Sequence, residues 1–251
     1  MPEAATEMTI PGRSLHIGDL APNFEARTTM GHVSLSDYRG RWLMLFAHPA
    51  DFTPVCTSEF VALSCAASRF AGLGCALLAV SVDSLFSHLA WVRAIHDAFG
   101  VTVPFPIVED PSMVIGRAYG MIAEAAGDAS TMRSTFFIDP AGIIRAMTCY
   151  PATVGRSVDE MLRVVAALQR VDAADVVIPE GWHPGEDVLV PPEIHQDAML
   201  TDQRDDPVRR YVRGAARRGI EIEHAVDHRR LARDGIENDV RRGEGRFVKH
   251  V

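Results

Sequence analysis

The stretch HPADFTPVCTSEF (48–60) places a threonine, two prolines and a cysteine directly after an apolar run. Thr53 suits the position just before a helix and Pro54 its first turn, which makes Cys56 the third helical residue. The sulfur would then lie beside backbone N–H groups without a partner inside the helix, at the positive end of the helix dipole. Because the thiolate is the nucleophilic form of cysteine, this placement predicts a reactive thiol.

The same cysteine also suits a purely structural role. Cys56 begins a stripe of apolar residues with helical spacing, which continues through Phe60, Leu63, Ala67 and Phe70. Buried cysteine is commonly a small hydrophobic residue, so spacing alone leaves the two interpretations balanced. One helix terminus supplies less than the roughly 2.7 kcal/mol that makes a free cysteine mostly thiolate at neutral pH. The reactive interpretation therefore requires a nearby cation.

The other three cysteines, Cys65, Cys75 and Cys149, lack such a setting and are predicted to be structural. None forms a CxxC pair, and four scattered cysteines do not make a secreted disulfide framework. The first residues lack the basic-then-apolar order of a signal peptide, and no apolar stretch approaches the roughly 20 residues of a membrane span. These features predict a cytoplasmic protein with free thiols and no membrane partner.

The 251-residue chain is 47% hydrophobic, enough to bury a full core, and has a formal net charge of -8. Residues 201–251 hold 13 of its 25 Lys and Arg, but these alternate with acidic residues, as on a solvated surface. No nucleic-acid partner is therefore expected. His224 and His228 stand four residues apart in this tail, yet the pattern fixes no third ligand, so we predict neither a metal site nor a cofactor.

The elements around Cys56 follow from hydrophobic patterning. Apolar runs at 41–48 and 74–82 predict two strands that flank a helix over 54–71. A helix capped by Asp83, with apolar residues at 85, 89, 92, 95 and 99, should end at Gly100. Next come a strand within 103–110 and a short helix near 111–119. They are followed by a hairpin that turns at DPAG (139–142) and by a helix with a Ser157/Glu160 capping box. This order predicts an α/β, thioredoxin-like fold with a central mixed sheet flanked by helices.

We expect three regions along the chain. Residues 1–171 form the predicted thioredoxin-like domain, and residues 172–213, rich in Pro, Gly and Asp, form an extended arm. Residues 214–251 are an Arg-rich charged extension without a second core. Trp182 and the apolar residues at 188–190 are costly to leave in water, so the arm is expected to cover another surface.

Several motifs together resemble the peroxiredoxins of the AhpC/TSA type, and among them the 1-Cys subgroup. HPADFTPVCTSE is similar to that group's active-site motif, including the Pro-x-x-x-Thr-x-x-Cys spacing of Pro49, Thr53 and Cys56. Further segments look like their counterparts in the same order: GDLAPNFEA (18–26), VSVDSLFSHLAWV (80–92), RSTFFIDPAGIIR (133–145), YPATVGR (150–156) and GWHPGEDVLVPP (181–192). The resemblance covers residues 10–213 in rough outline.

The resemblance implies an antioxidant thiol peroxidase that reduces hydrogen peroxide and organic hydroperoxides. Cys56 would be the peroxidatic cysteine, which attacks a peroxide oxygen and becomes a sulfenic acid. Thr53 would hold the peroxide, and Pro49 would shield the thiolate from water. Arg133 is the expected cation, which favours the thiolate and stabilises charge that develops on the oxygens.

Four further residues are assigned lesser roles. His48, at a strand end, orients the substrate pocket or simply caps the strand. Glu59 lies in the first turns of the cysteine helix and is expected to partner the helix dipole and no more. Arg156 matches an arginine of the YPATVGR-like motif and is expected to hold the helix start or Glu59. Trp91 and Phe52 are predicted to pack against the site.

The positions of the cysteines decide the subtype. Val61 stands where one two-cysteine type has its resolving cysteine, and no cysteine follows Cys149. This departure favours a 1-Cys cycle, in which a thioredoxin-like protein, glutathione or another small thiol resolves the sulfenic acid. Cys65 could meet Cys56 only after local unfolding. The family's arm implies a homodimer or a higher oligomer. A redox-sensing or chaperone-like binding protein on the same fold is the alternative.

Overall fold

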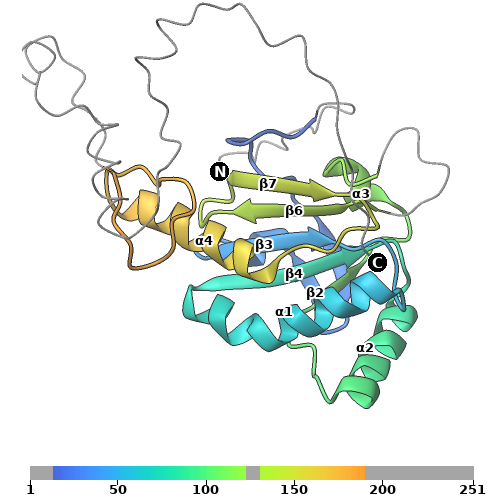
Figure 1. Ribbon diagram of the computed structural model, residues 1–251. Coiled ribbons are helices and arrows are strands. Elements are labelled where there is room, and N and C mark those ends of the chain that lie inside the picture. Colours follow the sequence, from blue (N-terminus) through green and yellow to red (C-terminus); the bar gives the residue numbers. More distant parts are fainter. Residues whose placement is uncertain (1–13, 123–130, 190–251) are drawn as a thin grey trace, which may run out of the picture. The chain divides into compact units, whose positions relative to one another are not determined.

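The computed structural model describes residues 14–122 and 131–189, and Figure 1 shows a central sheet with helices packed against it. The chain divides into two units between Glu186 and Asp187, and the fold described below is that of the first. The pair His224 and His228, the charged extension and residues 190–213 of the arm lie outside the described residues.

The sheet has seven strands in the order β2-β1-β5-β4-β3-β6-β7. They are β1 (Glu25–Thr28), β2 (Gly31–Ser34), β3 (Trp42–Ala47), β4 (Cys75–Ser81), β5 (Ile107–Glu109), β6 (Arg133–Ile138) and β7 (Ile144–Tyr150). Strand β3 runs parallel to β4 and antiparallel to β6. Every residue of β3 is buried, as expected of a central strand covered on both faces.

Helices cover both faces of the sheet. The helices α1 (Pro54–Gly72), α2 (Leu85–Phe99) and α4 (Val158–Ala173) pack on one face. The 3-10 helix η1 (Leu35–Tyr38) and the short helix α3 (Val114–Ala118) pack on the other. Alternate side chains of β3 enter the two cores, Met44 and Phe46 toward α1 and Leu43 and Leu45 toward η1.

The start of α2 differs from the sequence prediction. Ser84, not Asp83, is the N-cap, and its side chain accepts a hydrogen bond from the backbone N–H of Ser87. The Asp83 carboxylate instead accepts from the hydroxyl of Ser81 and from the backbone N–H of Asp51, a residue in the loop before α1. Asp83 therefore ties two loops together at the same edge of the sheet, where β3 and β4 both end.

The buried face of α2 agrees only in part with the predicted stripe, of which Ile95 is buried and Val92 packs against the core. Its buried residues are His88, Trp91 and Ile95, whereas Leu89 and Phe99 of the predicted stripe expose 45% and 56% of their surface. The apolar pattern was misleading because a polar residue, His88, occupies the buried face and finds a hydrogen-bond partner there.

Helix α4 and the segment that follows it lie side by side. Ser157 caps α4 by accepting from the backbone N–H of Glu160, but the Glu160 carboxylate pairs with Arg163 and so only half of the expected capping box forms. Arg163 also donates to the carbonyl of Trp182. The Trp182 side chain is 4% exposed, and its indole N–H donates to the carbonyl of Glu186. The expectation that Trp182 needs another surface to cover it is therefore wrong.

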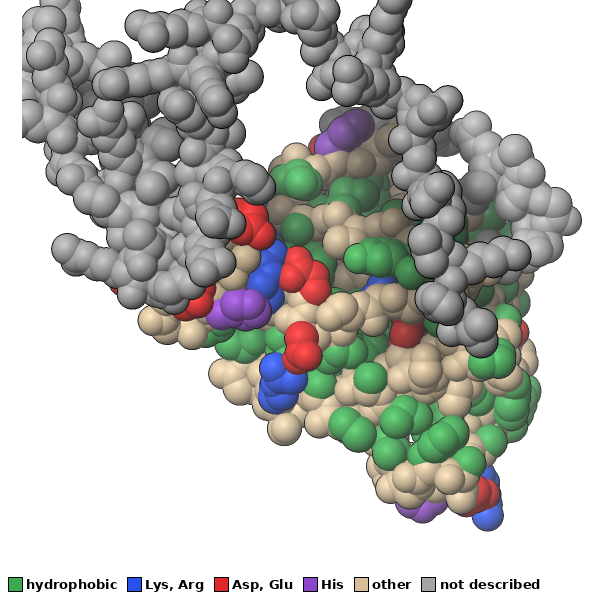
Figure 2. Space-filling model, viewed as in Figure 1, with side chains coloured by type: hydrophobic (Ala, Val, Ile, Leu, Met, Phe, Trp, Pro, Cys, Tyr) green, Lys and Arg blue, Asp and Glu red, His purple; other side chains and the backbone are tan. Residues whose placement is uncertain are grey.

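Two further observations concern the helices and the surface of the described residues. No helix there is both long enough and apolar enough to cross a membrane. On the face shown in Figure 2, basic and acidic side chains are interspersed, and hydrophobic side chains gather over the region of α2.

Candidate active site

Cys56 lies in the first turn of α1, immediately behind the end of β3. Thr53 is the N-cap with extended backbone angles, and Pro54 occupies the first helical position. The Thr53 hydroxyl does not cap the helix but donates to the carbonyl of Ala50 at 2.8 Å. Cys56 is completely buried, and Pro49, at the start of the preceding loop, is buried as well. Local sequence rules are sufficient to place the sulfur at this helix terminus.

Arg133 reaches the sulfur because of the register between β3 and β6. Phe46 pairs with Thr135 in this antiparallel ladder, which sets Arg133 level with His48, one residue beyond the end of β3. From there its Nη1 donates to the Cys56 Sγ at 3.3 Å. Two further nitrogens of the guanidinium donate to the carbonyl of Ala152 at 2.7 and 3.1 Å. The guanidinium is thus fixed in place and is only 2% exposed.

Glu59 bridges two buried arginines. One of its oxygens accepts from Arg133 Nη1 at 2.8 Å and from Arg156 Nη2 at 2.9 Å. The other accepts from the backbone N–H and Nε of Arg156, at 2.7 and 3.0 Å. Arg156 also donates to the carbonyl of Ser134 and the hydroxyl of Thr135. The expectation that Glu59 is no more than a dipole partner is therefore wrong.

The electrostatics of this cluster favour an anion at the sulfur. Burial raises the pKa of the Glu59 carboxyl, but the hydrogen bonds and charge of Arg156, together with the charge of Arg133, outweigh burial and hold the pKa below its usual value. Two guanidiniums and one carboxylate leave one excess positive charge in a buried place. A thiolate at Cys56, in contact with Arg133, would balance it.

The other cysteines have different surroundings. Cys75 is buried in β4, where burial raises the pKa of its thiol to about 12. Cys65 is exposed on α1, and Cys149 is exposed on β7, where its thiol contacts the Met132 sulfur and the Ser134 hydroxyl. No arginine hydrogen bond to any of these three sulfurs is found in the described part of the chain, which separates them from Cys56.

A buried histidine pair was missed by sequence reasoning. The carboxylate of Asp51 lies 2.9 Å from His48 Nε2 and 2.8 Å from His88 Nδ1, and all three side chains are at most 2% exposed. Burial lowers the pKa of His48, and the hydrogen bond and charge of Asp51 offset only part of this effect. The available signal was the spacing of His88, three residues before Trp91 and seven before Ile95 on one helix face.

The two aromatic residues predicted at the site behave differently. Trp91 is buried, its ring centroid is 4.5 Å from that of Phe60 and 5.2 Å from that of His48, and its N–H donates to the Thr57 hydroxyl. Phe52 is 57% exposed and has a φ of 60°, the left-handed region that a bulky residue rarely adopts. The prediction that Phe52 packs against the site is therefore wrong.

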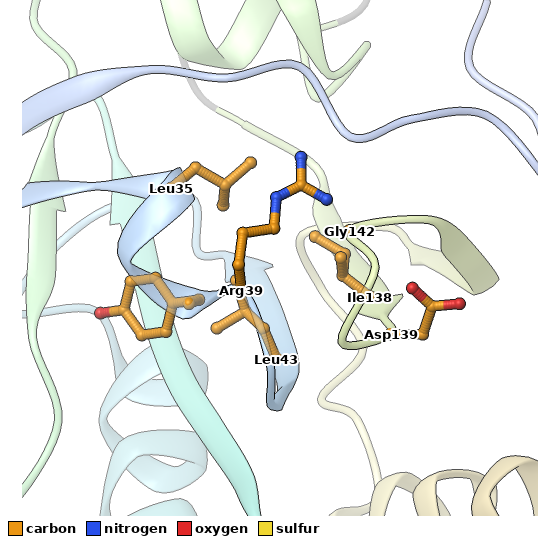
Figure 3. A pocket seen from close by; sticks show the side chains of 7 residues that line it. Leu35, Arg39, Leu43, Ile138, Asp139 and Gly142 are labelled. Atoms are coloured by element: carbon orange, nitrogen blue, oxygen red, sulfur yellow. The ribbon is translucent and has the colours of Figure 1, made fainter.

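A small cavity lies on the opposite face of the sheet from Cys56. Figure 3 shows the side chain of Arg39 between Leu35 and the turn at Gly142, with Leu43 below it. The Arg39 guanidinium donates to the carbonyl of Ala141. The cavity has a volume of about 10 Å³, about enough for one water molecule. It is therefore too small to bind substrate in place of the Cys56 site.

The fold and the site define a class: an α/β protein with one buried cysteine that contacts an arginine at a helix N-terminus. Residues 17–147 match the AhpC/TSA family, and residues 167–205 match the C-terminal domain of 1-Cys peroxiredoxin. The chain therefore belongs to the AhpC/TSA family. It is a peroxiredoxin, a thiol peroxidase, as the sequence motifs predicted.

Individual relatives agree. Peroxiredoxin 2 of Caldanaerobacter subterraneus subsp. tengcongensis is 48% identical over 70% of this chain and 80% of its own length. Peroxiredoxin 2 of Thermoplasma acidophilum is 44% identical over 73% of this chain and 92% of its own length. The structure of a yeast mitochondrial 1-Cys peroxiredoxin has a TM-score of 0.68 and 40% identity over 73% of this chain and 90% of that one. The predicted thioredoxin-like fold is confirmed.

Proposed function

We propose that this peroxiredoxin reduces hydrogen peroxide and organic hydroperoxides by a 1-Cys cycle in which an external thiol restores Cys56. The observation that carries the proposal is the 3.3 Å contact between the Cys56 sulfur and Arg133, within a buried cluster that has one positive charge in excess. This arrangement makes Cys56 the described cysteine that is best suited to react as a thiolate.

The reaction proceeds in three steps. The Cys56 thiolate attacks the terminal oxygen of the peroxide, the S–O bond forms as the O–O bond breaks, and the departing alkoxide or hydroxide takes up a proton. An external thiol then attacks the sulfenic acid and releases water, leaving a mixed disulfide. A second thiol attacks this disulfide and returns Cys56 to its reduced form. Each turnover therefore converts two thiols into one disulfide.

The neighbouring residues take the following roles in this proposal. Arg133 stabilises the thiolate and the charge on the departing oxygen. The Thr53 hydroxyl, which now bonds to Ala50, exchanges this bond for one to the peroxide. Pro49 keeps water from the sulfur, and His48 lines the pocket. Glu59 holds Arg133 in place from behind, and Arg156 bonds to Glu59 and not to Arg133.

An external thiol is required because no second cysteine is suitably placed. Cys65 is exposed on the same helix nine residues along, and the burial of Cys75 keeps its thiol protonated. The related yeast mitochondrial enzyme is described as resolved through glutathione and thioredoxin systems. We propose the same class of reductant here, and a cytoplasmic location, since the four cysteines are all free and a reducing compartment keeps them so.

Steady-state peroxide consumption tests the proposal. The full-length protein should turn over hydrogen peroxide many times when thioredoxin, glutathione with glutaredoxin, or dithiothreitol is supplied, and only once without a thiol. A redox sensor or a chaperone-like binding protein would instead react once and stop in the presence of every one of these thiols. Such a result would replace the enzymatic proposal with that alternative.

We also propose that the protein is a homodimer in which the arm, residues 172–213, contacts the other subunit. The match of residues 167–205 to the C-terminal domain of 1-Cys peroxiredoxin supports this proposal. Phe86 and Leu89 on α2, which are 77% and 45% exposed, offer additional apolar surface for a partner.

Two truncations test the dimer. A cut at Asp172 would remove the buried Trp182 and the Asp172–Arg145 ion pair, and so would damage the fold itself. A cut after Glu186 leaves these contacts intact and should give monomers in analytical ultracentrifugation, whereas a cut after Gly214 should leave dimers. Monomers of the full-length protein at micromolar concentration would refute the dimer, and dimers after the cut at Glu186 would move the interface away from the arm.

A further inference from the structure

The network formed by His48, Asp51 and His88 joins the active-site loop to α2. Asp51 lies in the loop over residues 48–53, between the end of β3 and Thr53, and its carboxylate bridges the two imidazoles. Its backbone N–H is held in addition by the Asp83 carboxylate at 2.9 Å. Phe52, the next residue, is exposed and contributes little packing. The loop is therefore attached to α2 by the hydrogen bond between Asp51 and His88, beside the ring contact of His48 with Trp91.

The hydrogen bonds fix the protonation of the network. Burial alone raises the pKa of Asp51, but the hydrogen bonds from His48 and His88 outweigh it, so the carboxylate stays ionised and only accepts. Each imidazole therefore donates from the nitrogen that faces Asp51. The outer nitrogens, His48 Nδ1 and His88 Nε2, are buried and have no hydrogen-bond partner among residues 14–122 and 131–189. A proton on either outer nitrogen would therefore be buried without an acceptor among these residues, which is costly.

This arrangement of donors and acceptors does not fit a metal site. The three side chains offer ligand atoms within 4.8 Å of one another, as a cation would need. A cation bound at the inner nitrogens would, however, force the protons onto the outer ones, where neither imidazole has an acceptor. Metal-binding histidines nearly always donate their other N–H to such an acceptor. The network therefore serves to hold the loop in place by hydrogen bonds and is not a cation site.

We propose that His88 is a positioning residue, which acts through Asp51 to hold in place the 48–53 loop that leads into the first turn of α1, where Cys56 lies. Cys56 is fully buried, so an external thiol, which is bulkier than a peroxide, reaches its sulfur only when a neighbouring segment moves, and this loop directly precedes the helix that carries Cys56. His88 thus favours reaction with peroxide and restrains access by thiols. The effect on reduction of the sulfenic acid by an external thiol rests on the proposed 1-Cys cycle. The role of His88 in holding the loop does not.

Substitutions of His88 test this role in a chain whose exposed Cys65 and Cys149 are replaced by serine. His88→Leu keeps apolar bulk but removes the donor, whereas His88→Asn retains a donor near the position of Nδ1. His96→Leu, on the exposed side of the same helix, is the matched control. The rate constant of Cys56 with hydrogen peroxide and its rate of alkylation by N-ethylmaleimide are measured for each, with the site of alkylation identified by mass spectrometry.

We expect His88→Leu to slow the reaction with peroxide about tenfold, because misplacement of the loop disturbs the approach geometry, and to speed alkylation of Cys56 by a similar factor. His88→Asn should return both rates toward those of the parent, and His96→Leu should change neither. Cys75, buried in β4, reports global unfolding and should remain unlabelled.

Three results would overturn the proposal. These are unchanged alkylation of Cys56 in His88→Leu, a parallel increase at Cys75, or a decrease of both Cys56 rates together, which would place the effect on the thiolate instead of the loop. Failure of the parent protein to consume peroxide with any thiol would refute the proposed function. The alkylation rates would still decide whether His88 holds the loop.

Discussion

Replacing Cys56 by serine is expected to abolish peroxide consumption, with a loss of at least about a thousandfold in turnover. A serine hydroxyl does not ionise near neutral pH, so the contact with Arg133 cannot generate a nucleophile. The side chains are nearly the same size, and the fold should persist because the neighbouring Glu59 keeps both of its arginine partners. The measurement is hydrogen peroxide consumption with saturating dithiothreitol, alongside a thermal unfolding curve.

Matched substitutions at the other cysteines serve as controls. Cys65→Ser and Cys149→Ser change exposed residues, and Cys75→Ala avoids placing a hydroxyl in the buried core. All three should retain most of the activity, since none of these sulfurs has the arginine and helix-terminus setting of Cys56. A Cys149 variant as inactive as the Cys56 variant would disprove the 1-Cys cycle.

Replacing Arg133 by methionine is expected to slow the reaction of Cys56 with peroxide about a hundredfold, the usual effect of removing one fixed donor from a developing oxyanion. The same substitution is also expected to lower the stability of the protein. Arg133 is buried and bonded to Glu59 and Ala152. We therefore expect the free energy of unfolding to fall by about 2 kcal/mol. The loss is modest because Glu59 keeps its second guanidinium partner, Arg156.

Arg156→Met is the matched control for this substitution. It also removes one of the two guanidiniums from Glu59, but Arg156 has no hydrogen bond to the Cys56 sulfur. Both variants should lose similar stability in urea unfolding, and only Arg133→Met should lose most of the single-turnover rate with peroxide. Equal loss of rate in the two would show that the cluster acts as a whole, and that the direct contact of Arg133 with sulfur is not the important one.

The sequence by itself determined the features that depend on neighbours along the chain. The placement of Cys56 in the first turn of α1 follows from Thr53 and Pro54, since helix termini obey local rules. The βαβ unit and the hairpin follow from apolar runs and turn residues. The motifs identified the family because they recur in order. Even the error at Asp83 was a local one, as two adjacent residues were both good caps.

The tertiary structure alone decided how the site is charged and held. Glu59 lies between Arg133 and Arg156 because the antiparallel register of β3 and β6, and the loop after β7, bring together residues far apart in the sequence. Asp51 meets His88 because β3 and β4 end at the same edge of the sheet. A polar residue on an apolar helix face predicts a partner but does not name it. The partner is set by long-range packing, which local patterns do not encode.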